Sequence, residues 1–184
     1  MLKRAVLNAA IAIAAILSVH ETMTITTKIG DGGKSLYMGK MIDKDSAEME
    51  TMGALDELMA VLGIVMMRND NKIGDKIEKI NQDLYLIMGM LSGYGNKEID
   101  LEEKIKYMED EIERMEKEKG TVEEFLEAGK QLDTRLNWAR TVCRRAERRL
   151  VVLSKIQQID ENILIYINRL SDYLFMIARR EEKG

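Results

Sequence analysis

The 184-residue chain contains no proline, one cysteine and one histidine, and few of its residues are aromatic. Without proline no helix loses a backbone N–H donor, and the abundance of Met, Ile, Lys and Glu is typical of helical proteins. The single cysteine, Cys143, excludes an internal disulfide bond and favours a reducing compartment. The single histidine, His20, argues against histidine-based acid–base or metal chemistry.

A large excess of charge of one sign is also lacking, since 32 acidic side chains stand against 28 basic ones. This balance argues against broad nucleic-acid binding, because the basic residues are concentrated locally rather than in excess. The length favours one domain.

The first 22 residues contain an apolar run. Lys3 and Arg4 precede the run, which extends from Ala5 to Val19 and is shorter than the roughly 20 residues of a transmembrane helix. It also lacks a clean small-x-small cleavage site. We interpret residues 1–22 as an upstream extension, with a weak anchor or an export signal as alternatives, and expect the domain at residues 23–184.

Amphipathic periodicity predicts five helices, so the expected fold is an all-α five-helix bundle. Ser46 is the expected N-cap of the first helix and Gly120 the expected end of the third. The helices are predicted at about 46–67, 71–91, 100–119, 130–155 and 160–180. In the third helix, apolar residues from Leu101 to Met115 step 4-3-4-3, which predicts one buried seam. Residues 37–45 are predicted to be irregular.

Residues 140–149 form the most informative stretch of the chain, with five arginines and one glutamate. On a helix Arg140, Arg144 and Arg148 share one face. Adjacent guanidinium groups repel unless an anion lies across them, and arginine presents phosphate with a planar fork of donors. The run therefore indicates a polyphosphate site. A solvated basic face with Glu147 as counter-ion is the alternative.

A glycine-rich loop precedes the first helix. Residues 26–36 contain three glycines, two lysines and several hydroxyl side chains. Glycines let backbone N–H groups approach an anion closely, and lysines add positive charge. The spacing is not that of a Walker A loop. On its own the loop is either an anion-binding loop or a plain turn.

A third polar segment runs from Tyr166 to Phe175. Apolar residues follow helical spacing there, and Asn168, Arg169 and Asp172 occupy the remaining faces. We expect Arg169 and Asp172 to form an ordinary i,i+3 ion pair.

Together these segments resemble the PduO-type ATP:cob(I)alamin adenosyltransferases. The resemblance runs from about Thr26 to Arg179. It rests on four motifs in order: Thr-Lys-x-Gly-Asp-x-Gly at residues 27–33, Gly-Ala-Leu-Asp-Glu-Leu at 53–58, the arginine run, and residues 166–175. Any one motif is modest support, but four in the right order make the resemblance strong.

The resemblance implies transfer of the 5′-deoxyadenosyl group of ATP to cob(I)alamin, giving adenosylcobalamin and triphosphate. The corrinoid is expected to enter as cob(II)alamin with its lower ligand displaced, which eases reduction. Mg²⁺ is expected on the triphosphate, with no dedicated metal site. The resemblance also implies a cobalamin adenosyltransferase-like (ferritin-like) bundle that forms a cytoplasmic homotrimer with sites between subunits. A reductase and an adenosylcobalamin-dependent enzyme are expected partners, and nucleic acid and membranes are not.

Motif matches also imply roles for individual residues. Arg144, Asp56, Arg140 and Asn168 are the implied catalytic set, in which Arg144 contacts phosphate and Asp56 pairs with Arg140 across a subunit boundary. Phe125 falls near the family's aromatic residue that blocks the lower cobalt ligand. The implied ATP-binding residues are Arg144, Asn168, Thr26, Thr27, Lys28, Gly30, Asp31, Gly32, Gly33, Ser35, Lys44, Glu147 and Arg148.

Several positions depart from the family pattern. Met59 stands where asparagine is common, Asn137 stands where histidine is common, and the loop after Phe125 is shorter and lacks proline. These departures affect the corrinoid side more than the ATP side. Two alternatives therefore stay open: a relative that binds ATP or a corrinoid without turnover, and a structural helical bundle.

Overall fold

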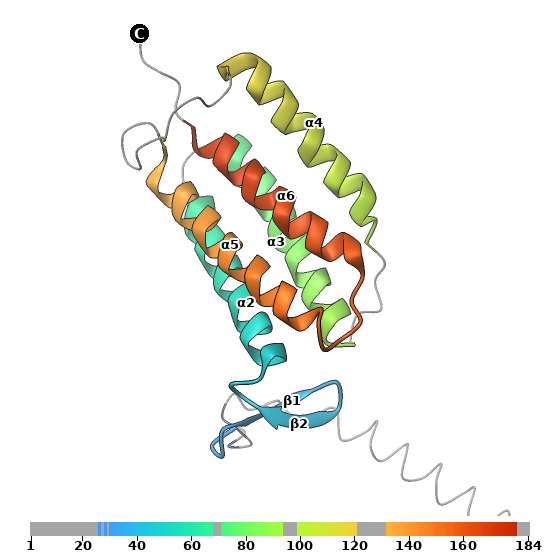
Figure 1. Cartoon of the computed structure of the whole chain (residues 1–184). Helices are drawn as coiled ribbons and strands as arrows, with labels where there is room; N and C mark the ends of the chain where they lie inside the picture. Colours follow the sequence, from blue (N-terminus) through green and yellow to red (C-terminus); the bar gives the residue numbers. More distant parts are fainter. Residues whose placement is uncertain are drawn as a thin grey trace, which may run out of the picture. The chain divides into compact units, whose positions relative to one another are not determined.

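The computed structural model describes Thr26, Lys28 and residues 30–67, 71–93, 99–120 and 132–179. The chain divides into two units, Met1–Gly33 and Lys34–Gly184. In its described residues, the second unit contains five helices (Figure 1), which are α2 (Ala47–Met66), α3 (Asn71–Leu91), α4 (Leu101–Lys119), α5 (Thr134–Leu153) and α6 (Glu161–Ala178). The predicted all-α five-helix fold is confirmed, with one small two-stranded sheet added. Within the described ranges, no helix is long and apolar enough to cross a membrane.

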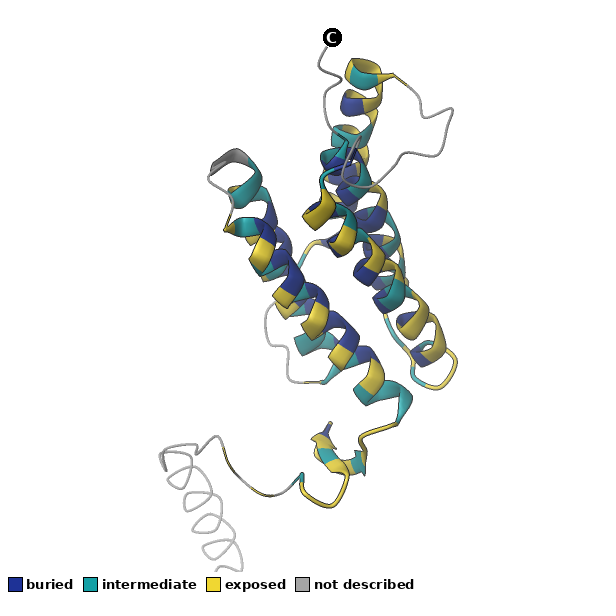
Figure 2. Cartoon of the chain, turned by 90° about the vertical axis from the view of Figure 1, so that its left-hand side faces the viewer, coloured by how far each residue is buried: buried dark blue, intermediate teal, exposed yellow. Residues whose placement is uncertain are grey.

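The helices bury their apolar faces against one another, each packing on the next in the order α3, α2, α5, α6, α4. Helix α2 packs against α3 and α5, α5 packs against α6, and α6 packs against α4. Buried residues line the inner faces of the helices, as Figure 2 shows. On α4 the predicted seam is confirmed, because Leu101, Ile105, Met108 and Met115 are buried and Ile112 packs against the core.

Four helices begin at residues whose side chains accept otherwise unpaired backbone N–H groups. Ser46 caps α2, as predicted, and Asp100, Asp133 and Asp160 cap α4, α5 and α6. A capping side chain replaces the hydrogen-bond partner that the first turn of a helix lacks. Gly120 has φ 74° at the end of α4, a value that glycine adopts without steric cost.

The prediction that residues 37–45 are irregular is wrong. Strands β1 (Lys34–Tyr37) and β2 (Lys40–Asp43) form an antiparallel hairpin in which Tyr37 pairs with Lys40. The two turn residues, Met38 and Gly39, have φ values of 48° and 75°. Positive φ at both positions is the geometry of a type I′ turn, whose twist matches that of the strands. Met in place of Asn or Asp at the first turn position hides this hairpin from sequence reasoning.

The fourth helix begins later and ends earlier than predicted. The Oδ1 atom of Asp133 accepts the N–H groups of Arg135 and Leu136, at 3.0 and 3.1 Å, which places the start of α5 at Thr134. Leu132 instead forms a β-bridge with Arg179 at the end of α6. At the other end α5 stops at Leu153, and residues 154–156 form a turn.

An ion-pair network connects α3 to α4. The Nζ atom of Lys76 lies 2.6 Å from Oε2 of Glu111, and the Nε atom of Arg114 lies 2.9 Å from Oε1 of the same carboxylate. These bonds, that of Arg114 first, lower the pKa of Glu111 from 4.5 to about 2, against the opposing effect of burial. The unfolded chain therefore binds more protons at this position between the two pKa values, and the network stabilises the fold most above pH 4.5.

We expect Glu111→Gln to lower the free energy of unfolding by about 1 kcal/mol at neutral pH, since a partly buried pair contributes at the upper end of the range for ion pairs. The difference should shrink as the pH falls from 4.5 towards 2. Urea unfolding over a pH series measures it. The control is Glu113→Gln, whose exposed pair with Lys117 should contribute little; a pH-independent difference for Glu111→Gln would contradict the assignment.

Candidate functional site

The five arginines of residues 140–149 lie on two sides of helix α5. The apolar residues of its inner face, among them Leu136, Val142 and Leu150, are buried, so the arginines occupy the outer faces. Arg145 forms an ion pair with Glu57 of α2. Arg149 forms another with Glu50 of α2, at 3.1 Å. These two arginines thus fasten α5 to α2, whereas Arg140, Arg144 and Arg148 lie on the predicted common face.

At the centre of that face, four side chains from α5 and α6 form what we call the Arg144 cluster: Arg144, Glu147, Asn168 and Ser171. The Nη1 atom of Arg144 lies 3.0 Å from Oε2 of Glu147. Asn168 donates through Nδ2 to Oε1 of the same carboxylate, at 2.7 Å. Arg144 also donates to Oγ of Ser171, at 3.3 Å. The structure therefore brings together three predicted ATP-binding residues, with Glu147 as the bridge between the helices.

The other two arginines of the face lie one turn to either side of Arg144. Arg140 donates through Nε to Oδ1 of Asn137, at 3.0 Å, and its guanidinium lies 6.0 Å from the ring centre of Phe175. Arg148 donates through Nη1 to the backbone oxygen of Arg144, at 3.0 Å. Asn137, which departs from the family pattern, thus holds Arg140 within its own chain.

Asp56 lies on the exposed surface of α2. Among the described residues of the same chain, neither Arg140 nor any other residue forms an ion pair with it. The predicted Asp56–Arg140 pair across a subunit boundary stays a prediction.

The Arg144 cluster has the chemistry of an anion site. Glu147 neutralises only part of the positive charge of the face, because Arg144 and Arg148 lie within one helical turn of it. Arg144 is 46% exposed whereas Glu147 is 18% exposed, so the guanidinium faces solvent and the carboxylate lies behind it. A planar guanidinium fixed from behind presents its free N–H groups to an incoming phosphate without further ordering. The alternative of Glu147 as a plain counter-ion describes one contact of this arrangement but leaves the bond from Asn168 unexplained.

The described residues of the first unit form a tight turn. The N–H of Asp31 donates to the oxygen of Lys28, and the N–H of Gly33 donates to the oxygen of Gly30, each at 3.2 Å. Gly33 has φ 75°, a left-handed value that favours glycine. Gly32 and Thr26 are exposed in the same segment. This geometry fits both alternatives for the loop, since a turn with glycines can also receive an anion.

Two further predicted residues lie on or beside the hairpin of the second unit. Ser35 belongs to β1, and Lys44 is exposed directly after β2. The hydroxyl of Tyr37 donates to the backbone oxygen of Leu91, at 2.6 Å. This bond holds the hairpin, and with it Ser35 and Lys44, against the end of α3. Thr27 and Phe125 lie outside the described residues.

Two features outside the cluster bear on other chemistry. Cys143 is fully buried on α5, and burial raises the pKa of its thiol far above the usual range despite the nearby Arg144. It is therefore a packing residue and not a reactive thiol. In the described ranges, no group of three or more His, Cys, Asp or Glu side chains is placed to hold a metal ion.

Arg169 and Asp172 form the predicted i,i+3 pair, at 3.2 Å.

Sequence reasoning missed Ser171 as a site residue. Its hydroxyl donates to the backbone oxygen of Asn168, at 2.9 Å, and accepts from Arg144. The available signal was its position three residues after Asn168, which places both on one helix face. Ser171 is 2% exposed, so it acts on Arg144 from inside the protein.

We expect Ser171→Ala to weaken ATP binding by about two- to tenfold, because the variant lacks one hydrogen bond to Arg144 and this is the range for one hydrogen bond. The variant should fold, because alanine is smaller and has high helix propensity. Titration with ATP, with Ser154→Ala as a control at an exposed hydroxyl, measures the effect. Unchanged ATP affinity and turnover in Ser171→Ala would show that Ser171 does not position Arg144.

Comparison with known proteins identifies the family to which the chain belongs. A family model described as Cobalamin adenosyltransferase matches residues 25–181. The corrinoid adenosyltransferase of Bacillus subtilis is 35% identical over 167 residues, which cover 85% of this chain and 86% of that protein. The corrinoid adenosyltransferase of Citrobacter freundii is 34% identical over 172 residues, which cover 86% of this chain and 94% of that protein.

Solved structures agree with these sequences. A variant of the PduO-type ATP:corrinoid adenosyltransferase from Lactobacillus reuteri, complexed with cobalamin and ATP, superposes with a TM-score of 0.78 at 31% identity. The match covers 85% of this chain and 92% of that chain. Another variant of the same enzyme, complexed with ATP, gives a TM-score of 0.76 at 33% identity, covering 84% and 92%.

Proposed function

The chain belongs to the cobalamin adenosyltransferase family, and we propose on this premise that the Arg144 cluster is where it binds the ATP it consumes. The enzyme transfers the 5′-deoxyadenosyl group of ATP to cob(I)alamin and produces adenosylcobalamin and triphosphate. The observation that carries the assignment of the site is the contact between Arg144, Glu147 and Asn168, three residues from two motifs of the resemblance.

The reaction determines what the protein must supply. Cob(I)alamin is a strong nucleophile that attacks C5′ of ATP, so the new bond is Co–C5′ and the bond that breaks joins C5′ to the triphosphate oxygen. Negative charge develops on the leaving triphosphate. The protein must therefore hold triphosphate, align C5′ with cobalt and exclude water.

Arg144 is the residue that we assign to the leaving group. Glu147 and Ser171 fix its guanidinium from behind, so its remaining N–H groups are oriented before ATP binds. Preoriented donors stabilise developing charge without reorganisation during the reaction. Arg148 adds charge to the same face, and Asn168 contributes from α6. Mg²⁺ would enter with the triphosphate.

The glycine-rich loop is proposed to complete phosphate binding. It would contribute backbone N–H groups and the charge of Lys28, together with the other loop residues Thr26, Thr27, Gly30, Asp31, Gly32 and Gly33. Ser35 and Lys44, which the Tyr37 bond holds beside the bundle, would extend the same site from the hairpin. Phe125 is proposed to displace the lower cobalt ligand.

A trimer would place each site between two subunits. Asp56 has no ion-pair partner among the described residues of its own chain, and Arg140 is half-buried beside Asn137 and Phe175. A homotrimer in which Asp56 meets Arg140 of a neighbouring subunit would give this exposed carboxylate its partner.

We further propose that the enzyme acts in the cytoplasm, receives electrons from a reductase and supplies an adenosylcobalamin-dependent enzyme.

The test of this function is anaerobic incubation of the protein with MgATP and chemically reduced cob(I)alamin. Enzyme-dependent loss of the Co(I) absorbance and appearance of a light-sensitive adenosylcobalamin spectrum are expected. Omitting ATP controls for oxidation of Co(I). ATP binding without product would contradict the proposed activity and favour a relative that binds but does not turn over.

A further inference from the structure

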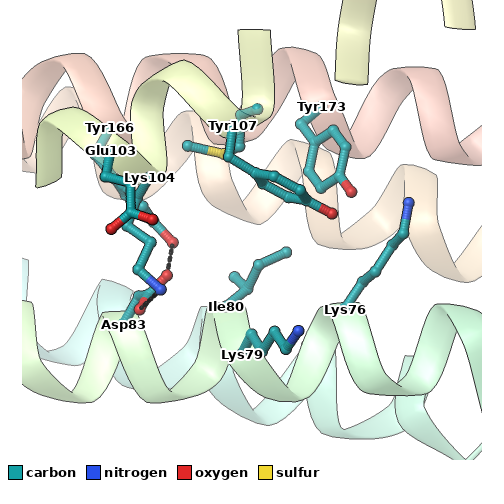
Figure 3. Close-up of a pocket in the computed structure, with 10 residues that line it drawn as sticks. Lys76, Lys79, Ile80, Asp83, Glu103, Lys104, Tyr107, Tyr166 and Tyr173 are labelled. Carbon is teal, nitrogen blue, oxygen red and sulfur yellow. Dashed lines mark hydrogen bonds and ion pairs between the residues drawn. The ribbon is translucent and has the colours of Figure 1, made fainter. Parts of the chain in front are cut away.

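A cavity of about 160 Å³ lies between α3, α4 and α6 (Figure 3). Its walls are largely apolar and are formed by Ile80, Met108 and the rings of Tyr107 and Tyr173. The two rings meet edge to face, with centres 6.4 Å apart. The volume matches that of an engineered cavity of about 150 Å³ that binds benzene. By size, the cavity accepts one small ring.

The hydroxyl of Tyr173 is a buried donor at this cavity. Tyr173 is 1% exposed, and its hydroxyl bonds to no backbone or charged group within the described ranges; its hydrogen-bonding neighbour is the hydroxyl of Tyr107. Figure 3 shows the hydroxyls of Tyr173 and Tyr107 directed towards the side where the ammonium of Lys76 lies. Burial first, and the Tyr107 hydroxyl second, raise the pKa of Tyr173, so the group stays protonated. Two facing hydroxyls share only one hydrogen bond between them, so one donor at the cavity lacks an acceptor, a cost that a ligand with an acceptor oxygen would relieve.

Charged side chains of both signs line the same cavity. Three lysines line it against two carboxylates, those of Asp83 and Glu103. Lys104 lies 3.6 Å from Asp83, and Lys76 lies 2.6 Å from Glu111. Lys79 forms no ion pair with any described residue. Figure 3 shows Glu103 and Asp83 at the end of the cavity away from Tyr173, so an acceptor beside the Tyr173 hydroxyl is on the side of the unpaired Lys79 ammonium, which favours an anionic acceptor over a neutral one.

Asp83 is already satisfied and does not compete for that role. Its Oδ2 accepts the hydroxyl of buried Tyr166, at 3.1 Å. Burial raises the pKa of Asp83, while Lys104 opposes the shift. On the side of the cavity away from Glu103, the polar groups that can meet a ligand are the Tyr173 hydroxyl and the Lys79 ammonium.

We propose that this cavity binds a small monocarboxylate whose apolar part is about the size of a benzene ring. The carboxylate accepts the hydrogen bond of Tyr173 and is attracted by the unpaired Lys79, while the ring packs against Ile80 and Met108. The site is separate from the Arg144 cluster. Tyr166 and Tyr173 face α3 and α4 from α6, whereas Asn168 and Ser171 contact α5. The inference goes beyond adenosyl transfer and does not rest on it.

Titration of the full chain with benzoate tests the site, with toluene as the uncharged probe and binding followed by ligand-observed NMR. Tyr173→Phe should weaken benzoate about two- to tenfold, as expected for one hydrogen bond, and leave toluene unchanged. Its fold should be intact, because the hydroxyl bonds to no backbone or charged group within the described ranges. Lys79→Gln should weaken benzoate about two- to fivefold, because an exposed charge contributes less.

The matched control is Lys117→Gln, which removes the same charge from the outer face of α4, where Lys117 pairs with Glu113. It should not change benzoate binding. Absence of saturable benzoate binding overturns the proposal. So does benzoate binding that neither Tyr173→Phe nor Lys79→Gln weakens. Inorganic phosphate that displaces benzoate with equal affinity would also overturn it, since the apolar walls would then contribute nothing.

Discussion

Arg144→Ala is expected to lower kcat for adenosyl transfer by about a hundred- to a thousandfold, the range for removing one preoriented donor from a transition state. The physical reason is the charge that develops on triphosphate as the C5′–O bond breaks. Arg144→Lys should recover part of the loss, because lysine keeps the charge but lacks the planar fork. Steady-state consumption of cob(I)alamin with MgATP measures both variants.

Arg149→Ala is the matched control for this result. Arg149 lies on the same helix and is 47% exposed, against 46% for Arg144, but it pairs with Glu50 of α2. Its removal should change kcat by less than about twofold, since an exposed ion pair contributes little. An equal loss of activity in both variants would mean that the net charge or the stability of α5 matters, and not the Arg144 cluster.

Mixing two inactive variants is expected to restore activity if Asp56 and Arg140 meet across a subunit boundary. Asp56→Ala and Arg140→Ala should each be nearly inactive alone. In trimers formed from equal amounts of both, about one quarter of the sites receive Asp56 and Arg140 from subunits that keep them, because each site draws one residue from each neighbour. Co-expression with two affinity tags yields the mixed trimers, and their activity is compared with that of each variant alone.

The control mixture combines Arg140→Ala with Arg144→Ala. Both residues lie on α5 of one subunit, so every site in this mixture lacks one arginine and no activity should return. Recovery in both mixtures would point to contamination by native protein. No recovery in the first mixture, with trimers intact, would contradict the pairing of Asp56 with Arg140.

The helices could be predicted because their signals are local. Apolar spacing fixes which residues face inward, and Ser46 and Gly120 mark the ends of helices through bonds or φ values within a few residues. The same periodicity placed Arg140, Arg144 and Arg148 on one face. The hairpin was missed because its turn uses Met38 at positive φ, where the usual residue of the turn is Asn or Asp.

The partners of the arginines could not be predicted from spacing. Five arginines within ten residues look alike in sequence, yet Arg145 and Arg149 form ion pairs with α2 whereas Arg144 contacts Glu147 and Ser171. The difference depends on which helix packs on which side of α5. The role of Ser171 and the position of the Tyr173 hydroxyl at the cavity likewise depend on contacts between distant segments.

The sequence by itself determined the all-α class, the helix positions and the face that carries Arg144, because each follows from periodicity and capping within one helix. Only the tertiary structure decided which arginines are bound to α2, that Glu147 bridges Arg144 and Asn168, and that burial makes Cys143 inert. It also decided that α3, α4 and α6 enclose a cavity with a free donor. These features depend on desolvation and on distances between helices. The residue pattern within one helix carries no information on either.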